Sequence, residues 1–388
     1  MIAYNKTWLA NLRVQALLKK DLHRGYITQV EFKAITEKYP VGFYMPGLFA
    51  RIGLFFLTCI VVSFADGLLT LFFAASNLAF TGGWMIFLGL LSYAGLEAIV
   101  NIKHHYRSGV DDALLFISAC LFVTGFAVLF WKNDTDYLTL SAILFVFNLY
   151  FSIRFADMLM SALCCAAFLG FIFFSWTKVV PAGFTTAPFI MMLVSAGIYW
   201  ISAIRSNNEK NIDYHHCLLV AQIIGLATLY AAGNYYVVQT LSDELNGRSG
   251  GSIPFGTFFW ALTTLLPLIY IGFGIRKKNV ILLRTGLLLI TISVITFRNY
   301  YHSLPIGTTL VIAGAAILGI AYGIMKYLKT SKFGFTYAEP DNANLMDHLN
   351  VESLIVAETF STAPAAPIEN GPKFGAGDFG GGGSSSSF

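Results

Sequence analysis

Residues 137–176 decide the fold class of this chain; they read YLTLSAILFVFNLYFSIRFADMLMSALCCAAFLGFIFFSW. Only Arg154 and Asp157 carry charge in this run of about forty residues. A single helix of that length would be about 60 Å long, whereas the hydrocarbon core of a bilayer is about 30 Å thick. The run therefore predicts two membrane-spanning helices joined by a tight turn at Arg154 and Asp157.

The composition of the whole chain also indicates a membrane protein. Hydrophobic residues make up 56% of the 388 residues and charged residues 12%, with a mean hydropathy of +0.66. Soluble domains carry about 25% charged residues, so this chain lacks the polar surface that water requires. The net charge of +4 is too small to indicate a nucleic-acid-binding protein.

The cysteines lie inside or at the edge of apolar runs. They are Cys59, Cys120, Cys164, Cys165 and Cys217. This placement argues against a disulfide framework or a zinc ribbon. The chain also lacks a phosphate-binding Gly-rich loop and a His-Glu-x-x-His helix. We therefore expect no metal and no cofactor, and the sequence favours a protein that is not an enzyme.

Ten apolar windows are long enough to cross the bilayer, which takes about 20 residues. We place them at Leu48–Phe73, Gly82–Ile102, Asp112–Trp131, Tyr137–Ile153, Phe155–Trp176, Thr185–Ile204, Ile212–Gln239, Phe255–Ile275, Val280–Phe297 and Leu304–Tyr327. The sequence thus predicts an all-α polytopic transmembrane helix bundle over residues 47–328. Cytoplasmic segments, residues 1–46 and 329–388, are expected to flank it.

The loops between these windows differ sharply in their content of Lys and Arg. The terminal segments and the loops on the same side hold 21 such residues, against four on the other side: Lys132, Lys178, Arg248 and Arg298. Cytoplasmic loops collect Lys and Arg, so this asymmetry predicts that both termini are cytoplasmic.

Residues 1–46 are predicted to form a basic pair of short helices. Gly25 ends the first helix, Thr28 and Glu31 form a capping box at the start of the second, and Pro40 ends it. Such a pair suits a DNA-binding helix–turn–helix, a segment that docks on anionic lipid, or a module that packs on the loops of the bundle. Seven basic and three acidic residues give a charge of +4 beside a membrane, which favours anionic lipid over nucleic acid.

From residue 333 the composition becomes that of a tail. Seven acidic residues accompany a single basic residue, Lys373, and the chain ends in a Gly/Ser run. A segment this polar cannot bury a core, so we predict that it is mostly disordered, with one short amphipathic helix at Asn344–Ala357. A flexible end and a peptide that binds a protein partner both fit this composition.

Ionisable residues inside spans are candidates for function, because each costs about 2.5 to 3.5 kcal/mol at a helix centre. Asp66 and Gly67 interrupt a long apolar run, 48–80, which suits either a helix broken at Asp66 or a span that ends near it. Glu97 lies near the cytoplasmic end of the second span, from which its side chain can reach the headgroups.

Two more pairs complete the candidate polar site. Arg154 and Asp157 are three residues apart and are expected to form a structural ion pair if their turn is helical. Arg298 and His302 lie at the outer end of the ninth span with two tyrosines between them. They suit contact with an anion or headgroup, or an ordinary aromatic belt with an outward-reaching Arg.

Two histidine pairs lie at predicted cytoplasmic edges: His104-His105 and His215-His216. Three aspartates are close to them in sequence: Asp111, Asp112 and Asp213. Adjacent residues of a helix point about 100° apart, so at most one His of each pair can serve a metal site. The spacing therefore argues against metal binding there.

The layout resembles families of bacterial multi-pass membrane proteins of unknown function. The resemblance rests on a basic helical pair whose second helix starts near ITQVE, residues 27–31, followed by many Phe-rich spans. It implies residence in the bacterial inner membrane and implies nothing about a substrate.

Three classes of function stay open at this point. A secondary transporter or small-solute permease is favoured by the even number of spans and by Asp66. A membrane scaffold or assembly factor is favoured by the terminal segments and by the scarcity of buried charge. A membrane-embedded enzyme acting on a lipid-linked substrate would use the His and Asp edge or the Arg298 cluster, and would need a lateral opening to lipid.

Overall fold

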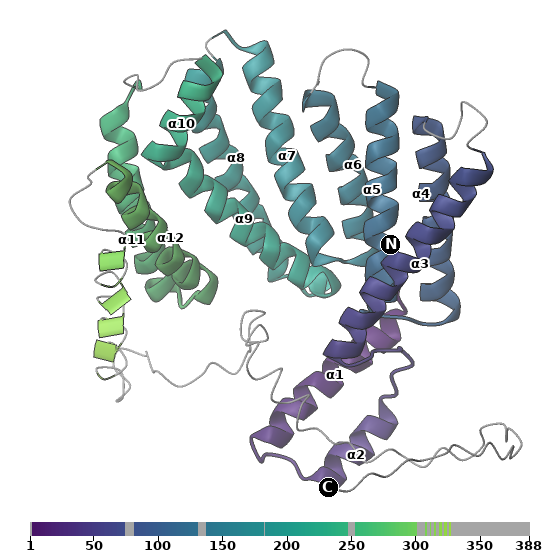
Figure 1. The fold of residues 1–388 in the computed structure, drawn as a ribbon. Helices are drawn as coiled ribbons and strands as arrows, with labels where there is room; N and C mark the ends of the chain where they lie inside the picture. The colour runs from purple at the N-terminus through teal and green to yellow at the C-terminus, as the bar shows by residue number, and fades with distance from the viewer. Residues whose placement is uncertain are drawn as a thin grey trace, which may run out of the picture. The chain divides into compact units, whose positions relative to one another are not determined.

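The computed structural model is a bundle of α-helices (Figure 1). It describes residues 2–73, 81–130, 137–181, 183–246 and 253–300, together with isolated helical residues between 307 and 326. These residues form helices and no β-strand. All the described residues belong to one compact unit, which spans residues 1–341. The predicted tail, including its short helix, lies outside the described residues.

Nine helices of the described residues are long and apolar enough to cross a membrane. They are α3 (Leu48–Phe72), α4 (Gly82–Ile102), α5 (Val110–Phe130), α6 (Tyr137–Phe155), α7 (Met158–Val179), α8 (Gly183–Ser206), α9 (His215–Gly233) with the short η1 (Glu209–Tyr214) before it, α11 (Gly256–Lys277) and α12 (Val280–Tyr300). The chain is a multi-pass integral membrane protein, and the predicted all-α bundle is confirmed. The tenth window, Leu304–Tyr327, lies largely outside the described residues.

The predicted hairpin in residues 137–176 is present, with a turn of only two residues. Helix α6 ends at Phe155 and α7 begins at Met158. Ala156 adopts a positive φ of 50°, and the Asp157 carboxylate accepts a hydrogen bond from the Met160 N–H at 2.8 Å. Because the turn is not helical, Asp157 serves as the N-cap of α7. The expected pairing of Arg154 with Asp157 is therefore wrong, and Arg154 pairs with Glu97 instead.

Helix α3 runs through Asp66 and Gly67 without a break. The broken helix lies in the seventh window, Ile212–Gln239, whose predicted end is also wrong. There α9 ends at Gly233, Asn234 is extended with φ −82° and ψ 125°, and a separate helix α10 (Tyr235–Asn246) follows. Figure 1 shows α10 turning away from the axis of α9.

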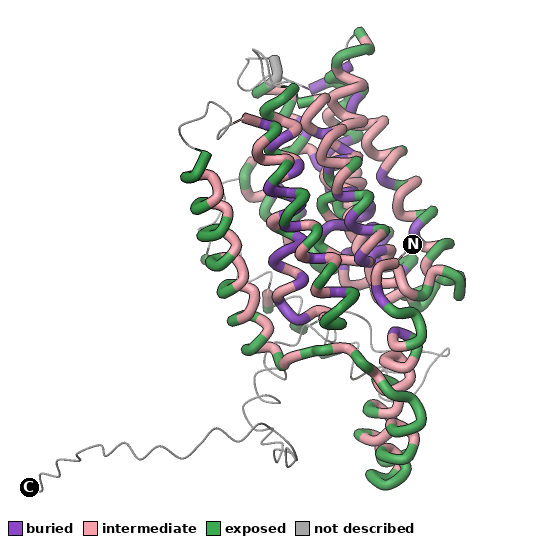
Figure 2. Tube along the Cα trace, turned by 90° about the vertical axis from the view of Figure 1, so that its right-hand side faces the viewer, coloured by how far each residue is buried: buried purple, intermediate pink, exposed green. Residues whose placement is uncertain are grey.

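The predicted N-terminal pair consists of α1 (Lys6–His23) and α2 (Gln29–Lys38). Both halves of the capping box are formed, since the Glu31 N–H donates to Thr28 Oγ1 and the Thr28 N–H donates to Glu31 Oε2. In Figure 2, buried residues run along the helices of the bundle, whereas this pair is mostly exposed or half-buried. The pair therefore gains little stability from a core of its own.

The N-terminal pair is held on one end of the bundle by specific contacts. The Ala3 N–H donates to the Arg154 carbonyl at 2.7 Å, and Arg13 Nη1 lies 2.8 Å from Asp213 Oδ1 in η1. Tyr44, after α2, donates its N–H to the His104 carbonyl at 3.0 Å. The pair thus contacts the loops of the bundle, and its docking on anionic lipid stays a prediction. We call this end of the bundle the N-terminal end.

Candidate functional site

Two of the predicted polar residues, Glu97 on α4 and Arg154 on α6, meet in a hydrogen-bonded network. Arg154 Nε lies 2.9 Å from Glu97 Oε1, and Arg154 Nη2 lies 2.9 Å from Glu97 Oε2. The Tyr93 hydroxyl donates to Oε1 at 2.6 Å and Asn101 Nδ2 to Oε2 at 2.9 Å. The charges compensate each other and both carboxylate oxygens are engaged, which is the pattern of a structural clamp between helices.

Asp157 lines a small polar cavity at the N-terminal end, together with Tyr4, Asp111 and Asp112. Asp111 is 2% exposed and accepts hydrogen bonds from the N–H groups of Arg107 and Ser108 and from the Tyr4 hydroxyl. Burial of Tyr4 next to this carboxylate raises the pKa of its hydroxyl well above the usual value. The cavity measures about 20 Å³, which is room for a single water molecule. It cannot hold a substrate.

The other predicted site residues lie elsewhere. Asp66 is half-buried on α3, Arg298 lies in the last turn of α12, and His302 lies outside the described residues. None of Asp66, Glu97 and Arg298 lines the polar cavity, or the pocket and the groove described below. The structure therefore joins Glu97 to Arg154 and does not gather the predicted set around one cavity.

The histidine pairs make ordinary polar and aromatic contacts. His105 Nδ1 lies 2.8 Å from Ser108 Oγ, and His215 Nδ1 lies 3.0 Å from Ser206 Oγ. The ring of His104 packs edge-on against Trp8. Among the described residues, no group of three His, Cys, Asp or Glu side chains is placed to hold a metal ion.

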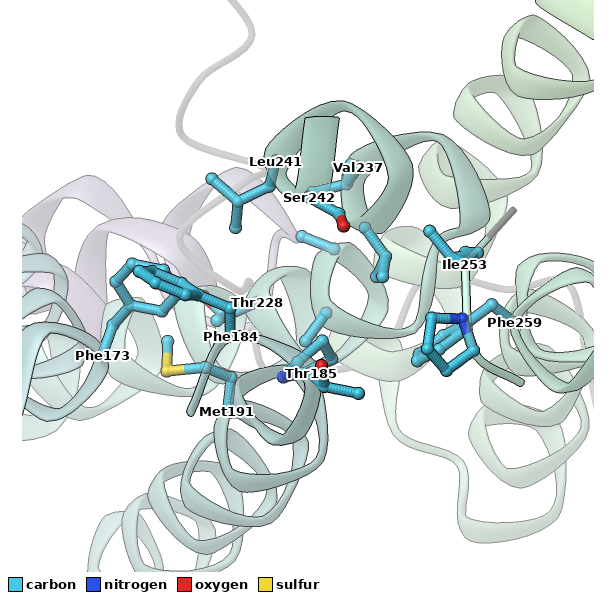
Figure 3. A pocket seen from close by; sticks show the side chains of 15 residues that line it. Phe173, Phe184, Thr185, Met191, Thr228, Val237, Leu241, Ser242, Ile253 and Phe259 are labelled. Carbon is cyan, nitrogen blue, oxygen red and sulfur yellow. The ribbon is translucent and has the colours of Figure 1, made fainter. Parts of the chain in front are cut away.

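A larger cavity, which we call the α10 pocket, lies among α7, α8, α9, α10 and α11 (Figure 3). Its volume is about 190 Å³. The side chains labelled in Figure 3 include Phe173 from α7, Phe184 and Met191 from α8, Thr228 from α9, Val237 and Leu241 from α10, and Ile253 and Phe259 near the start of α11. The pocket therefore lies in the half of the bundle away from the N-terminal end.

Asn234 holds α10 in place over this pocket. Its Oδ1 accepts hydrogen bonds from the N–H groups of Tyr236 and Val237, which caps α10, while its Nδ2 donates to the Tyr230 hydroxyl and to Thr296 Oγ1. Asn234 is only 1% exposed. An unsatisfied amide at membrane depth would cost several kcal/mol, so these four bonds are what makes the broken helix tolerable.

A second buried hydroxyl completes the junction between α9 and α10. Thr263 Oγ1 on α11 accepts the Tyr235 N–H at 3.0 Å and donates to the Phe259 carbonyl at 2.8 Å. The Thr263 carbonyl in turn accepts from Ser293 Oγ on α12 at 2.9 Å. The start of α10 is thus tied to both α11 and α12.

Helix α10 is amphipathic, and its apolar face covers the pocket. Val237, Val238 and Leu241 line the cavity, whereas the Tyr300 hydroxyl donates to Gln239 Oε1 at 2.6 Å. Tyr235 stacks on Trp260 of α11 with ring centroids 4.7 Å apart. These contacts attach α10 along one edge and leave its apolar face on the cavity.

The space under α10 exists because small side chains line α9 there. Ala231 and Ala232 form its floor, and Pro188 of α8 lies in its wall. Pro188 has no N–H, so the carbonyl of Phe184 lacks its usual helical donor. The only side-chain polar groups in the lining are the hydroxyls of Thr185, Thr228 and Ser242.

Size and polarity together define what this pocket can accept. Apolar cavities of about 150 Å³ stay dry and take up benzene, so a pocket of about 190 Å³ accepts an apolar group somewhat larger than benzene. No lining side chain is charged. The pocket is therefore suited to a hydrocarbon group and not to an ion.

The sequence carried one signal for this site that the hydropathy windows concealed. Gly233-Asn234 is a common way to end a helix. The residues after it, YYVVQTLSDELN, place their apolar side chains at helical spacing, as in an amphipathic helix. The predicted span 212–239 contains both features, so a single hydropathy window does not separate them. Comparisons with protein-family models, with curated proteins and with solved structures find no match.

Proposed function

We infer that the protein binds an alkyl chain of a membrane lipid in the α10 pocket. The observation that carries this inference is the lining, which has three hydroxyls and no charged side chain among 15 residues. A polar solute held there would leave its own polar groups without partners, at a cost of about 1 to 3 kcal/mol each. An alkyl chain has no such groups and matches the lining.

The position of the pocket also favours a lipid chain. Phe184, Val237 and Leu241 line it and are each about two-fifths exposed, so the cavity opens to the outside of the bundle. Helix α10 follows directly on the end of a spanning helix and is amphipathic, which is typical of helices at the boundary between headgroups and acyl chains. A chain can therefore enter sideways from the bilayer.

This interpretation favours a lipid-handling protein over a small-solute permease. A permease for a polar solute would place polar groups such as Asp66, Glu97 and Arg298 around a shared cavity, and these residues do not line the α10 pocket. The lateral apolar opening is the feature expected of a protein that acts on or carries lipid. The scaffold and enzyme alternatives stay predictions.

Photo-crosslinking tests the proposal on the full chain. The protein is placed in phosphatidylcholine nanodiscs that contain a phosphatidylcholine with a diazirine on its acyl chain, then illuminated, and the labelled peptides are identified by mass spectrometry. We expect label on the segments that carry Met191 and Leu241. Ala232→Phe should reduce that label roughly tenfold. The Phe ring would take up space in the pocket, and fitting the alkyl chain beside it would cost about 1 to 3 kcal/mol.

The matched control is Ala261→Phe, an exposed position on α11 outside the pocket lining, which should leave the label unchanged. A fatty acid with the same diazirine separates a free chain from a phospholipid chain as the source of the label. Label spread evenly over exposed residues, and insensitive to Ala232→Phe, would refute the proposal.

A further inference from the structure

A second apolar cavity lies against α9 and extends to the N-terminal end of the bundle at Lys277, in the last turn of α11. This groove measures about 260 Å³ and lies between α8 and α11. Its lining includes Ala196 and Tyr199 from α8, Gly225 from α9, and Tyr270, Phe273 and Lys277 from α11. It shares no lining residue with the α10 pocket.

The packing of α9 explains why the groove is open. A Cβ on Gly225 would lie 3.0 Å from both the Ser195 carbonyl oxygen and the Tyr199 nitrogen, so this glycine lets α8 approach α9 closely. On the other flank, the Tyr270 hydroxyl donates to the Leu226 carbonyl at 3.1 Å and fixes α11 on α9. Because α8 and α11 are each held against α9, neither helix fills the space between them.

One end of the groove is cationic. Lys277 lines it from the last turn of α11, with Nζ 5.9 Å from the ring centroid of Phe273, which is 48% exposed. Arg276 is also in that last turn, and Arg205 is in the last turn of α8, which ends at the same end of the bundle. No acidic side chain lines the groove.

We propose that this groove binds an anionic phospholipid of the leaflet at the N-terminal end, with an acyl chain along α9 and the phosphate at Lys277. Basic pockets between membrane helices recognise anionic headgroups in this way, and a chain beneath the headgroup requires an apolar channel. The groove supplies both features in the right order, because its apolar walls lead from mid-membrane to a cation at the surface. A zwitterionic lipid would fit the walls but gain less from the cation.

The proposal goes beyond lipid-chain binding under α10 and does not depend on it. The two cavities have separate linings, with no residue in common. Ala232→Phe should therefore leave anionic lipid in the groove, and substitutions in the groove should leave the label under α10. Either proposal can fail without the other.

The test is lipid retention by the purified full chain, measured by native mass spectrometry after exchange into detergent with added phosphatidylglycerol or phosphatidylcholine. We expect tighter binding of phosphatidylglycerol. Lys277→Ala should weaken it about fivefold, and Lys277→Arg should retain it, since one basic residue near the surface contributes about that factor. Ala196→Phe, at an exposed position in the groove wall, should weaken both lipids.

Lys103→Ala is the matched control. Lys103 is exposed at the end of α4, at the same end of the bundle, and does not line the groove. Equal losses for Lys103→Ala and Lys277→Ala would show a general surface attraction and overturn the proposal. Equal retention of the two lipids by the unmodified chain would overturn it as well.

Discussion

Arg154 on α6 and Glu97 on α4 form a two-pronged ion pair, with Nε–Oε1 and Nη2–Oε2 distances of 2.9 Å each. Their side chains are 29% and 20% exposed, so the rest of the protein covers most of the pair. The Arg154 carbonyl also accepts the Ala3 N–H. The same residue therefore joins two spanning helices to each other and to the N-terminal segment.

Glu97→Gln and Arg154→Met should each destabilise the bundle by about 2 to 3 kcal/mol, because each leaves one mostly covered charge uncompensated. The double variant should be more stable than the sum of the two losses implies, with a coupling of about 1 to 3 kcal/mol. Chemical denaturation in detergent, followed by circular dichroism, measures all four proteins. Additive losses would show that the ion pair contributes nothing as a pair.

Asn234→Ala should release α10. The substitution removes the cap of α10 and leaves the Tyr230 hydroxyl and Thr296 without their amide donor, which together should cost about 2 kcal/mol or more. Amide hydrogen exchange in Tyr235–Asn246 should therefore accelerate at least about tenfold. Gln239→Ala, which removes the bond to Tyr300 and leaves the Asn234 cap in place, should have a smaller effect. Similar exchange in both variants would contradict the role of Asn234.

The spanning helices could be predicted from sequence because hydrocarbon burial depends on local composition. The window Gly82–Ile102 agrees with α4 at both ends. The turn between α6 and α7 lies between Arg154 and Asp157, as the two charged residues predict. The partner of Arg154 could not be predicted in the same way. Glu97 lies 57 residues away, and only the packing of α4 on the rest of the bundle brings the two together.

The broken helix shows why the candidate site was harder to predict. Asp66 and Gly67 suit either a break or the end of a span in the sequence. Helix α3 has no buried residue, so a break there would expose backbone amides to lipid with nothing to bind them. At Asn234, the Asn side chain and Thr263 bind the freed amides. The cost of a break is thus set by tertiary partners, which a hydropathy window does not contain.

Gly109→Ala should destabilise the bundle by more than about 2 kcal/mol. Gly109 has a φ of +91°, and a Cβ there would lie 2.1 Å from the Arg51 carbonyl oxygen, where α3 crosses the start of α5. Gly25 is the control, since it has a φ of +73° but a Cβ added to it would meet nothing within 4 Å. Gly25→Ala should cost only the conformational strain, about 1 to 2 kcal/mol, within the N-terminal pair. Equal melting temperatures for the two variants would contradict the close contact.

Acidification should loosen the N-terminal segment through His105. Burial lowers the pKa of His105, with Lys103 acting in the same direction and the Asp111 carboxylate opposing them. The neutral ring packs on Tyr44 with centroids 4.8 Å apart. When the N-terminal segment is released, the His105 imidazole regains its ordinary pKa of about 6.5 and is protonated at a higher pH than in the packed state. The stability from this contact is therefore present above about pH 6.5 and is lost as the pH falls below it. Papain cleavage within residues 1–46 should therefore be faster at about pH 5.5 than at about pH 7.5. His105→Phe keeps an aromatic ring and removes the titration, so it should abolish this difference. If the ratio of the two cleavage rates is unchanged in that variant, the pH effect belongs to another group.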